Sequence, residues 1–206
     1  MQQRKVFLIW GKVGSGKTTL AKKILDQFSR VVIFDTLHEY HGTIVTTFPD
    51  FLDLAQERHD AEFRIICRYM SNVEYEYTAK AVRVLGNCLV VLEEVEAYLS
   101  SYEKDTENPI NWLISFGRHV NVSILGIGRT VTEIPKKLRA QFTSITTFVQ
   151  TEPADLAYLE AQGFDPDDVS SLEQFDYITV GEPIGGEKNF DPETTQEENA
   201  TPEGEV

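Results

Sequence analysis

Cysteine and long apolar segments are both scarce in this sequence of 206 residues. The two cysteines, Cys67 and Cys88, lie far apart and form no C-x-x-C pair, which argues against a disulfide scaffold or a zinc ribbon. No apolar run approaches the ~20 residues that cross a bilayer, and no secretory apolar region follows residues 1–5. We therefore expect a soluble, cytoplasmic protein without a membrane span.

Positive charge is scarce as well. The chain has 19 lysine and arginine residues against 33 acidic residues, for a formal net charge of -14. This balance argues against broad, nonspecific adsorption to DNA or anionic lipid, because such binding depends on basic side chains. Half of the charge follows residue 181, where eight acidic residues accompany one lysine and large apolar residues almost disappear. We predict a folded domain of residues 1–181 and an acidic, disordered tail of residues 182–206.

Short apolar segments alternate with amphipathic helical patterns along the predicted domain. The segments are rich in valine and isoleucine and apolar on both faces, which is typical of central strands in a parallel sheet. The alternation predicts an α/β fold, a three-layer sandwich with a mostly parallel central sheet. Asn108 and Pro109 predict the start of one helix, and Gly117 predicts its end. The predicted strands are residues 6–10, 31–34, 63–67, 89–92, 122–127 and 145–149.

A glycine-rich loop follows the first predicted strand and opens an amphipathic helix. Its pattern is G-x-x-x-x-G-K-[ST], whose glycines let backbone N–H groups turn toward phosphates at a helix N-terminus. Lys17 is expected to reach the β- and γ-phosphates of ATP, and the Thr18 hydroxyl is expected to ligate Mg²⁺. The predicted nucleotide-binding residues are Gly11, Lys12, Val13, Gly14, Ser15, Gly16, Lys17, Thr18 and Thr19.

Two adjacent carboxylates end the predicted strand of residues 89–92. Strand ends in open α/β sheets deliver side chains to the ligand crevice, so both should approach the phosphates. Glu93 is the candidate for Mg²⁺, directly or through water, and Glu94 is the candidate for orienting the attacking water. Aspartate is usual at the first position, so the longer Glu93 side chain could move the metal contact to a bridging water. Alternatively, both glutamates belong to the solvated first turn of a helix.

With these motifs the chain resembles the FtsK–HerA superfamily of DNA-translocating ATPases, and particularly the short viral genome-packaging ATPases. The features that carry the likeness are the loop of residues 11–18, the strand of residues 31–35 followed by residues 38–40, the glutamate pair, and residues 117–135. The resemblance implies a P-loop, RecA-like fold and ATP hydrolysis coupled to translocation of double-stranded DNA. It also implies a ring of subunits, commonly a hexamer, a capsid or portal-vertex partner, and a place in the host cytoplasm or the virion.

Rings of this family place each nucleotide pocket at a subunit border, so the resemblance implies a catalytic arginine supplied by the neighbouring subunit. Arg118 is the first candidate and Arg129 the second. Arg118 could equally close the C-terminus of a helix. The family tends to place a γ-phosphate-sensing glutamine where this chain has Gly128. Either Arg129 has taken over that polar contact, or the sensing is weaker here.

A DNA contact needs cations, and the densest basic cluster outside the nucleotide region is Lys136, Lys137 and Arg139. It follows Pro135, in a segment that could face the pore of a ring. The alternative is a solvated helix face, since three charges are few.

Two other functions remain open at this stage. In a small-molecule or nucleoside kinase, Arg64, Arg68 and Arg83 would form a phosphate-clamping lid. A secretion, conjugation or phage-morphogenesis ATPase of the same superfamily is the other alternative. A GTPase switch is disfavoured, because the sequence has neither an N-K-x-D nor a D-x-x-G motif.

Overall fold

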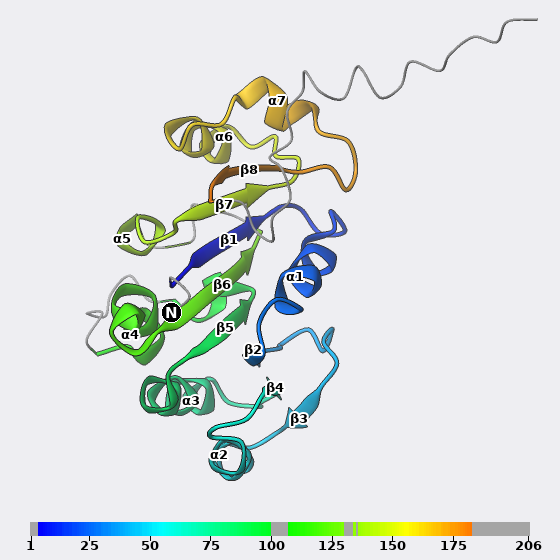
Figure 1. The fold of residues 1–206 in the computed structure, drawn as a ribbon. Helices are drawn as coiled ribbons and strands as arrows, with labels where there is room; N and C mark the ends of the chain where they lie inside the picture. Colours follow the sequence, from blue (N-terminus) through cyan, green and yellow to red (C-terminus); the bar gives the residue numbers. More distant parts are fainter. Residues whose placement is uncertain (1–3, 100–106, 130–133, 135, 183–206) are drawn as a thin grey trace, which may run out of the picture.

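The computed structural model describes residues 4–99, 107–129, 134 and 136–182. Within these residues the chain forms one eight-stranded sheet with helices on both faces (Figure 1). The strand order is β3-β4-β2-β5-β6-β1-β7-β8, and only the pair of β7 and β8 is antiparallel. The strands are β1 (Val6–Trp10), β2 (Arg30–Phe34), β3 (Thr43–Val45), β4 (Phe63–Cys67), β5 (Cys88–Glu93), β6 (Val122–Gly128), β7 (Ser144–Thr147) and β8 (Ile178–Gly181).

Apolar side chains on both faces of the central strands form two buried clusters. One lies under α2, α3 and α4, and the other lies under α1 and includes Phe148. This arrangement confirms the predicted three-layer α/β sandwich, with α1 as the main cover of the second face. The helices are α1 (Lys17–Leu25), α2 (Phe48–Glu57), α3 (Asn72–Leu85), α4 (Pro109–Phe116), α5 (Lys136–Arg139), α6 (Pro153–Ala161), α7 (Pro166–Ser171) and the 3₁₀ turns η1 (Val95–Ala97) and η2 (Gly117–Val120).

The six predicted strands are present, within a few residues of their predicted ends. The two edge strands, β3 and β8, were not predicted. Both are short and largely exposed or half-buried, so they lack the continuous apolar run that identifies a central strand. The domain boundary after residue 181 stays a prediction, because residues 183–206 lie outside the described part of the chain. Among the described residues, no helix is long and apolar enough to cross a bilayer.

The parallel register brings functional side chains to one edge of the sheet. Trp10, the last residue of β1, pairs with Gly128 of β6, and Glu93 of β5 pairs with Ile127 of β6. Phe34 of β2 pairs with Leu92 of β5. Because the carboxyl ends of parallel strands lie at the same edge, the glycine-rich loop, Asp35, Glu93 and Arg129 share that edge.

Candidate nucleotide site

The glycine-rich loop joins β1 to α1 in the conformation that its sequence predicts. Gly16 precedes the first turn of α1 with a φ of 104°, in the left-handed region that a side chain disfavours. A Cβ at Gly16 would also lie 3.2 Å from Phe175 and 3.4 Å from Phe148. The Gly16 carbonyl accepts the first helical hydrogen bond, from the Leu20 N–H at 3.0 Å. The free N–H groups of the first turn therefore open toward the loop, as phosphate binding requires.

Lys17 folds back over this loop. Its ammonium group donates to the Gly11 carbonyl at 2.7 Å and to the Lys12 carbonyl at 2.9 Å, and the residue is 9% exposed. Burial lowers the pKa of the Lys17 ammonium, while the nearby carboxylates of Glu94 and Glu93 raise it. The position places one cation between the loop and the acidic end of β5.

The other predicted loop residues form the rim of the site. Val13 is exposed at the tip, and the Lys12 ammonium donates to the Thr151 hydroxyl at 2.7 Å. Ser15 is buried beneath the loop, and its N–H donates to the Lys12 carbonyl at 3.3 Å. Thr19 is exposed and borders the same hollow as Thr18.

The end of β5 meets the start of α1 through one contact. The Thr18 hydroxyl lies 3.5 Å from Glu93 Oε1, at the limit of a hydrogen bond. Glu93 is only 2% exposed, and its Oε2 accepts a hydrogen bond of 2.6 Å from the Tyr40 hydroxyl. A hydroxyl and a carboxylate oxygen suit a hard cation such as Mg²⁺, which fills its remaining positions with water and phosphate oxygens. The described residues contain no cluster of three or more His, Cys, Asp or Glu that would bind a metal by itself.

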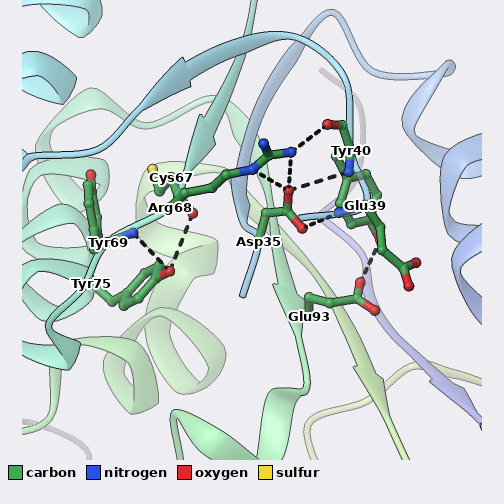
Figure 2. A network of polar contacts seen from close by, with 8 residues as sticks. All are labelled: Asp35, Glu39, Tyr40, Cys67, Arg68, Tyr69, Tyr75 and Glu93. Carbon is green, nitrogen blue, oxygen red and sulfur yellow. Dashed lines mark hydrogen bonds and ion pairs between the residues drawn. The ribbon is translucent and has the colours of Figure 1, made fainter. Parts of the chain in front are cut away.

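A polar network fixes the loop between β2 and β3 (Figure 2). Asp35, at the end of β2, accepts hydrogen bonds from the N–H groups of Glu39 at 2.9 Å and Tyr40 at 3.3 Å. Arg68, at the end of β4, binds the Asp35 carboxylate at 2.8 Å and donates to the Tyr40 carbonyl at 2.8 Å. Tyr40 in turn holds Glu93. The network therefore links three strand ends to the carboxylate beside Thr18.

This network was not predicted from the sequence, although the chain contains a signal for it. Asp35 and Arg68 each directly follow a buried strand, and an acid and a base in these positions meet if the strands are neighbours. The neighbouring strands are β2 and β4, in which Phe34 pairs with Cys67. Only the adjacency of the two strands could not be derived from the sequence.

Burial raises the pKa of the Glu93 carboxyl to about 7. The hydrogen bond from Tyr40 lowers the pKa, whereas the carboxylates of Glu39, Glu94 and Asp35 raise it. Because the folded protein binds this proton more tightly than the unfolded chain, the protonated carboxyl stabilises the fold at low pH. That stabilisation is lost as the pH rises through 7.

Replacing Glu93 with glutamine should raise the thermal stability of the metal-free protein at pH 8. The amide keeps an acceptor for Tyr40 and removes a buried charge whose cost is at most about 3 kcal/mol for the shift from 4.5 to about 7. We expect a melting temperature several degrees higher in EDTA, with the difference shrinking toward pH 5. Glu160→Gln, at an exposed position of α6, should change neither value. Equal melting temperatures for wild type and Glu93→Gln at pH 8 would contradict the assigned burial cost.

Glu94 leaves the strand and meets Arg129. Its backbone has a φ of 56°, left-handed and uncommon for a residue with a side chain, and the 3₁₀ turn η1 begins only after it. Glu93 ends β5 and is buried, so the two glutamates do not form the solvated first turn of a helix. Arg129, directly after β6, donates to Glu94 Oε1 from Nε at 3.0 Å and from Nη2 at 2.7 Å. The Arg129 N–H donates to Glu96 at 3.2 Å. Arg129 therefore lies beside Glu94 of the same chain.

The side chains of Val95 and Glu96 pack closely against Gly128, the position where the family tends to have a glutamine. A Cβ at this position would lie 2.7 Å from Glu96 Oε2 and 3.2 Å from Val95. A side chain at this position would therefore require the side chains of Glu96 and Val95 to move. The polar group at the end of β6 is instead the guanidinium of Arg129.

Sequence comparison places this site in a known family. Residues 2–161 match the family described as Poxvirus A32 protein. The chain belongs to the poxvirus A32 protein family. Relatives include the DNA packaging protein OPG160 of Variola virus, which is 26% identical over 148 residues, and that of Vaccinia virus (strain Western Reserve), which is 26% identical over 153 residues. These matches cover 68% of this chain and 52% of each relative, so the chain spans about half the length of the curated relatives it matches.

Solved structures share the fold of this A32 family member. The genome packaging NTPase B204 from Sulfolobus turreted icosahedral virus 2, in complex with ATP-gammaS, superimposes with a TM-score of 0.71 at 16% identity, over 88% of this chain and 94% of that chain. VirB4 of Thermoanaerobacter pseudethanolicus does so with a TM-score of 0.61 at 12% identity, over 85% and 86%. These likenesses confirm the predicted P-loop NTPase fold, with helices on both faces of a mostly parallel sheet.

Arg118 is remote from the glycine-rich loop of the same chain in this A32 family member. It is exposed in η2, before the first residue of β6, whereas the glycine-rich loop lies at the other ends of these parallel strands. Arg4 makes the contacts that close α4, donating to the carbonyls of Leu113 at 2.9 Å and Ile114 at 2.6 Å. Burial and the nearby Arg118 charge lower the pKa of Arg4 to about 10. Any contact between Arg118 and a triphosphate therefore requires a second subunit.

The three arginines of the kinase alternative do not converge. Arg64 pairs with Asp26 at 3.1 Å, and Arg68 belongs to the Asp35 network. Arg83 lies over the ring of Trp112, at 4.1 Å from its centroid, on the opposite face from α1. Each side chain has a separate partner, so the A32 family member has no phosphate lid built from them.

The basic cluster predicted to contact DNA lies on α5, before β7. Lys136 is exposed, and the Arg139 guanidinium lies 4.8 Å from the centroid of the Tyr158 ring. The side chain of Lys137 lies outside the described part of the chain. Because α5 precedes β7, the cluster is at the opposite end of the sheet from the glycine-rich loop (Figure 1).

Proposed function

We propose that this A32 family member is an ATP-hydrolysing DNA translocase that packages double-stranded viral DNA as a ring oligomer. The observation that carries the proposal is the approach of Thr18 and Glu93, which joins the phosphate loop to a buried carboxylate at the end of β5. The relatives named DNA packaging protein supply the substrate class. The P-loop ATPase domain comprises residues 1–181, and residues 182–206 are an acidic tail.

The proposed chemistry assigns one task to each side chain. Lys17 binds the β- and γ-phosphates, while the N–H groups of residues 14–19 surround them. Thr18 and Glu93 hold Mg²⁺, which neutralises charge on the phosphate oxygens. Glu94 orients the attacking water, and the two hydrogen bonds from Arg129 hold the Glu94 carboxylate in place.

A ring completes the proposed active site. Arg118 of one subunit would act on the nucleotide of the next, where a cation stabilises the charge of the transferred phosphoryl group. The contact of Arg129 with Glu94 of its own subunit favours the same-subunit role for Arg129 and leaves Arg118 as the arginine supplied by the neighbour. We propose a hexamer that docks on a capsid or portal-vertex protein in the host cytoplasm, with Lys136, Lys137 and Arg139 facing the DNA.

The rate of ATP hydrolysis should rise when double-stranded DNA is added. A translocase couples hydrolysis to its track, whereas a kinase consumes ATP only with its acceptor. Phosphate release with and without linear duplex DNA, together with the native mass of the assembly, tests the proposal. A rate that ignores DNA and rises with a nucleoside would overturn it in favour of the kinase.

Mixing Arg118→Ala subunits with wild-type subunits should reduce hydrolysis more than dilution does. Each variant subunit would disable the pocket of its neighbour, and in a ring whose pockets hydrolyse ATP in turn one disabled pocket stalls the others, so an equal mixture should retain well below half of the wild-type rate. Arg58→Ala, which removes an exposed arginine after α2, is the matched control and should leave the rate unchanged. A loss strictly proportional to the fraction of Arg118→Ala subunits would reject a ring whose pockets depend on one another through Arg118.

A further inference from the structure

Phe175 is an aromatic residue in a place that favours glycine and solvent-exposed polar groups. It lies between α7 and β8 and is 62% exposed. The Asp176 N–H donates to the Glu173 carbonyl at 3.2 Å, so Phe175 is the third residue of a β-turn. Its φ is 77°, a value that glycine adopts freely at this turn position and that a bulky residue adopts at a cost. Neither burial in the core nor the conformation of the turn explains why an aromatic residue occupies position 175.

The ring borders the phosphate loop. A Cβ at Gly16 would lie 3.2 Å from Phe175 Cδ1. Residues 14–19, Glu39 and Phe175 line one open hollow of about 250 Å³. Phe148 and Tyr177, whose ring centroids are 5.6 Å apart, pack beside this part of the loop and support it from the core. Phe175 is therefore the aromatic side chain that the hollow exposes to a ligand.

The strand order indicates how a nucleotide would be oriented in the hollow. β5 and β6, which carry Glu93 and Arg129, lie on one side of β1, and β7 and β8 lie on the other. A nucleoside triphosphate with its terminal phosphate toward Glu93 extends its nucleoside toward β7 and β8. Phe175 lies three residues before the start of β8 on that side, in the segment that follows α7 in Figure 1.

We propose that Phe175 is the stacking surface for the nucleobase of the bound nucleotide. The proposal rests on the proposed function, because it assumes a triphosphate in the loop. An exposed ring offers one π-face to a base, and such stacking adds affinity without a hydrogen bond. Phe175 thereby supplies the affinity that distinguishes a nucleotide from a bare polyphosphate.

Phe175→Ala should raise the Kd for ATP by between about 5- and 100-fold, as loss of one stacked base does. The Kd for inorganic tripolyphosphate, which has no base, should change by less than about twofold. Phe175→Trp should retain ATP affinity, and its added fluorescence should respond to ATP but not to tripolyphosphate. Titration calorimetry with Mg²⁺ measures both ligands, and thermal unfolding verifies that each variant is folded.

Tyr77→Ala is the matched control, because it removes a half-exposed ring from α3, on the opposite face of the sheet. It should leave both affinities unchanged. Equal ATP affinities for wild type and Phe175→Ala, with tripolyphosphate also bound, would overturn the stacking role and leave the proposed function standing. If wild type bound neither ligand, the proposed function itself would fail.

Discussion

Replacing Lys17 with alanine is expected to abolish ATP binding. The ammonium group is buried between the phosphate loop and the acidic end of β5, where water screens it little. Charge-assisted hydrogen bonds to two phosphates contribute about 1.5 to 3 kcal/mol each, so their loss weakens binding by a factor on the order of 10² to 10⁴. Titration calorimetry with ATP and Mg²⁺ measures the loss.

Lys23→Ala is the control for this prediction. Lys23 is an exposed lysine on the same helix, α1, so its removal changes the net charge equally and should not alter the affinity. Thermal unfolding of Lys17→Ala is needed as well, because the variant also loses the bonds to the Gly11 and Lys12 carbonyls. A folded Lys17→Ala protein with wild-type affinity for ATP would end the interpretation of residues 11–18 as a phosphate loop.

Glu94→Gln should bind ATP normally and hydrolyse it more slowly by a factor on the order of 10² to 10⁴. This is the usual effect of removing a general base. An amide cannot accept the proton of the attacking water. It also loses the charge that pairs with Arg129, so the side chain is less firmly oriented. Single-turnover hydrolysis and ATP affinity, measured on the same preparation, separate the chemical step from binding.

Glu160→Gln serves as the control, because it neutralises an exposed carboxylate on α6. Arg129→Ala provides a second comparison. If Arg129 only orients Glu94, its removal should slow hydrolysis in wild type and have little further effect in Glu94→Gln. A normal rate for Glu94→Gln would instead move the water-orienting role to Glu93 or to another group.

Local sequence signals were sufficient for much of the fold. The glycine-rich loop specifies its own turn, and continuous apolar runs mark the central strands because both faces of these strands are buried. The start of α4 is equally local, since the Asn108 side chain accepts from the N–H groups of Ile110 and Asn111 at 2.9 Å each. Such features depend on neighbours in the chain.

The features that could not be predicted depend on pairings between distant segments. Arg68 meets Asp35 only because β4 pairs with β2. The order of the strands in the sheet cannot be derived from the sequence alone. Phe175 approaches Gly16 only because β8 returns to the edge formed by β7. Gly128 shows the same limit, since the side chain that packs closest to it belongs to Glu96, which lies 32 residues earlier in the chain.

Tyr40 connects the loop of residues 36–42 to the carboxylate of Glu93. It is the one buried residue of that loop, and its N–H, carbonyl and hydroxyl are bonded to residues at the ends of β2, β4 and β5 (Figure 2). The other residues of the loop are exposed to solvent and accessible to a binding partner. A displacement of the loop would therefore reach the carboxylate of Glu93, the proposed Mg²⁺ ligand, through the Tyr40 side chain.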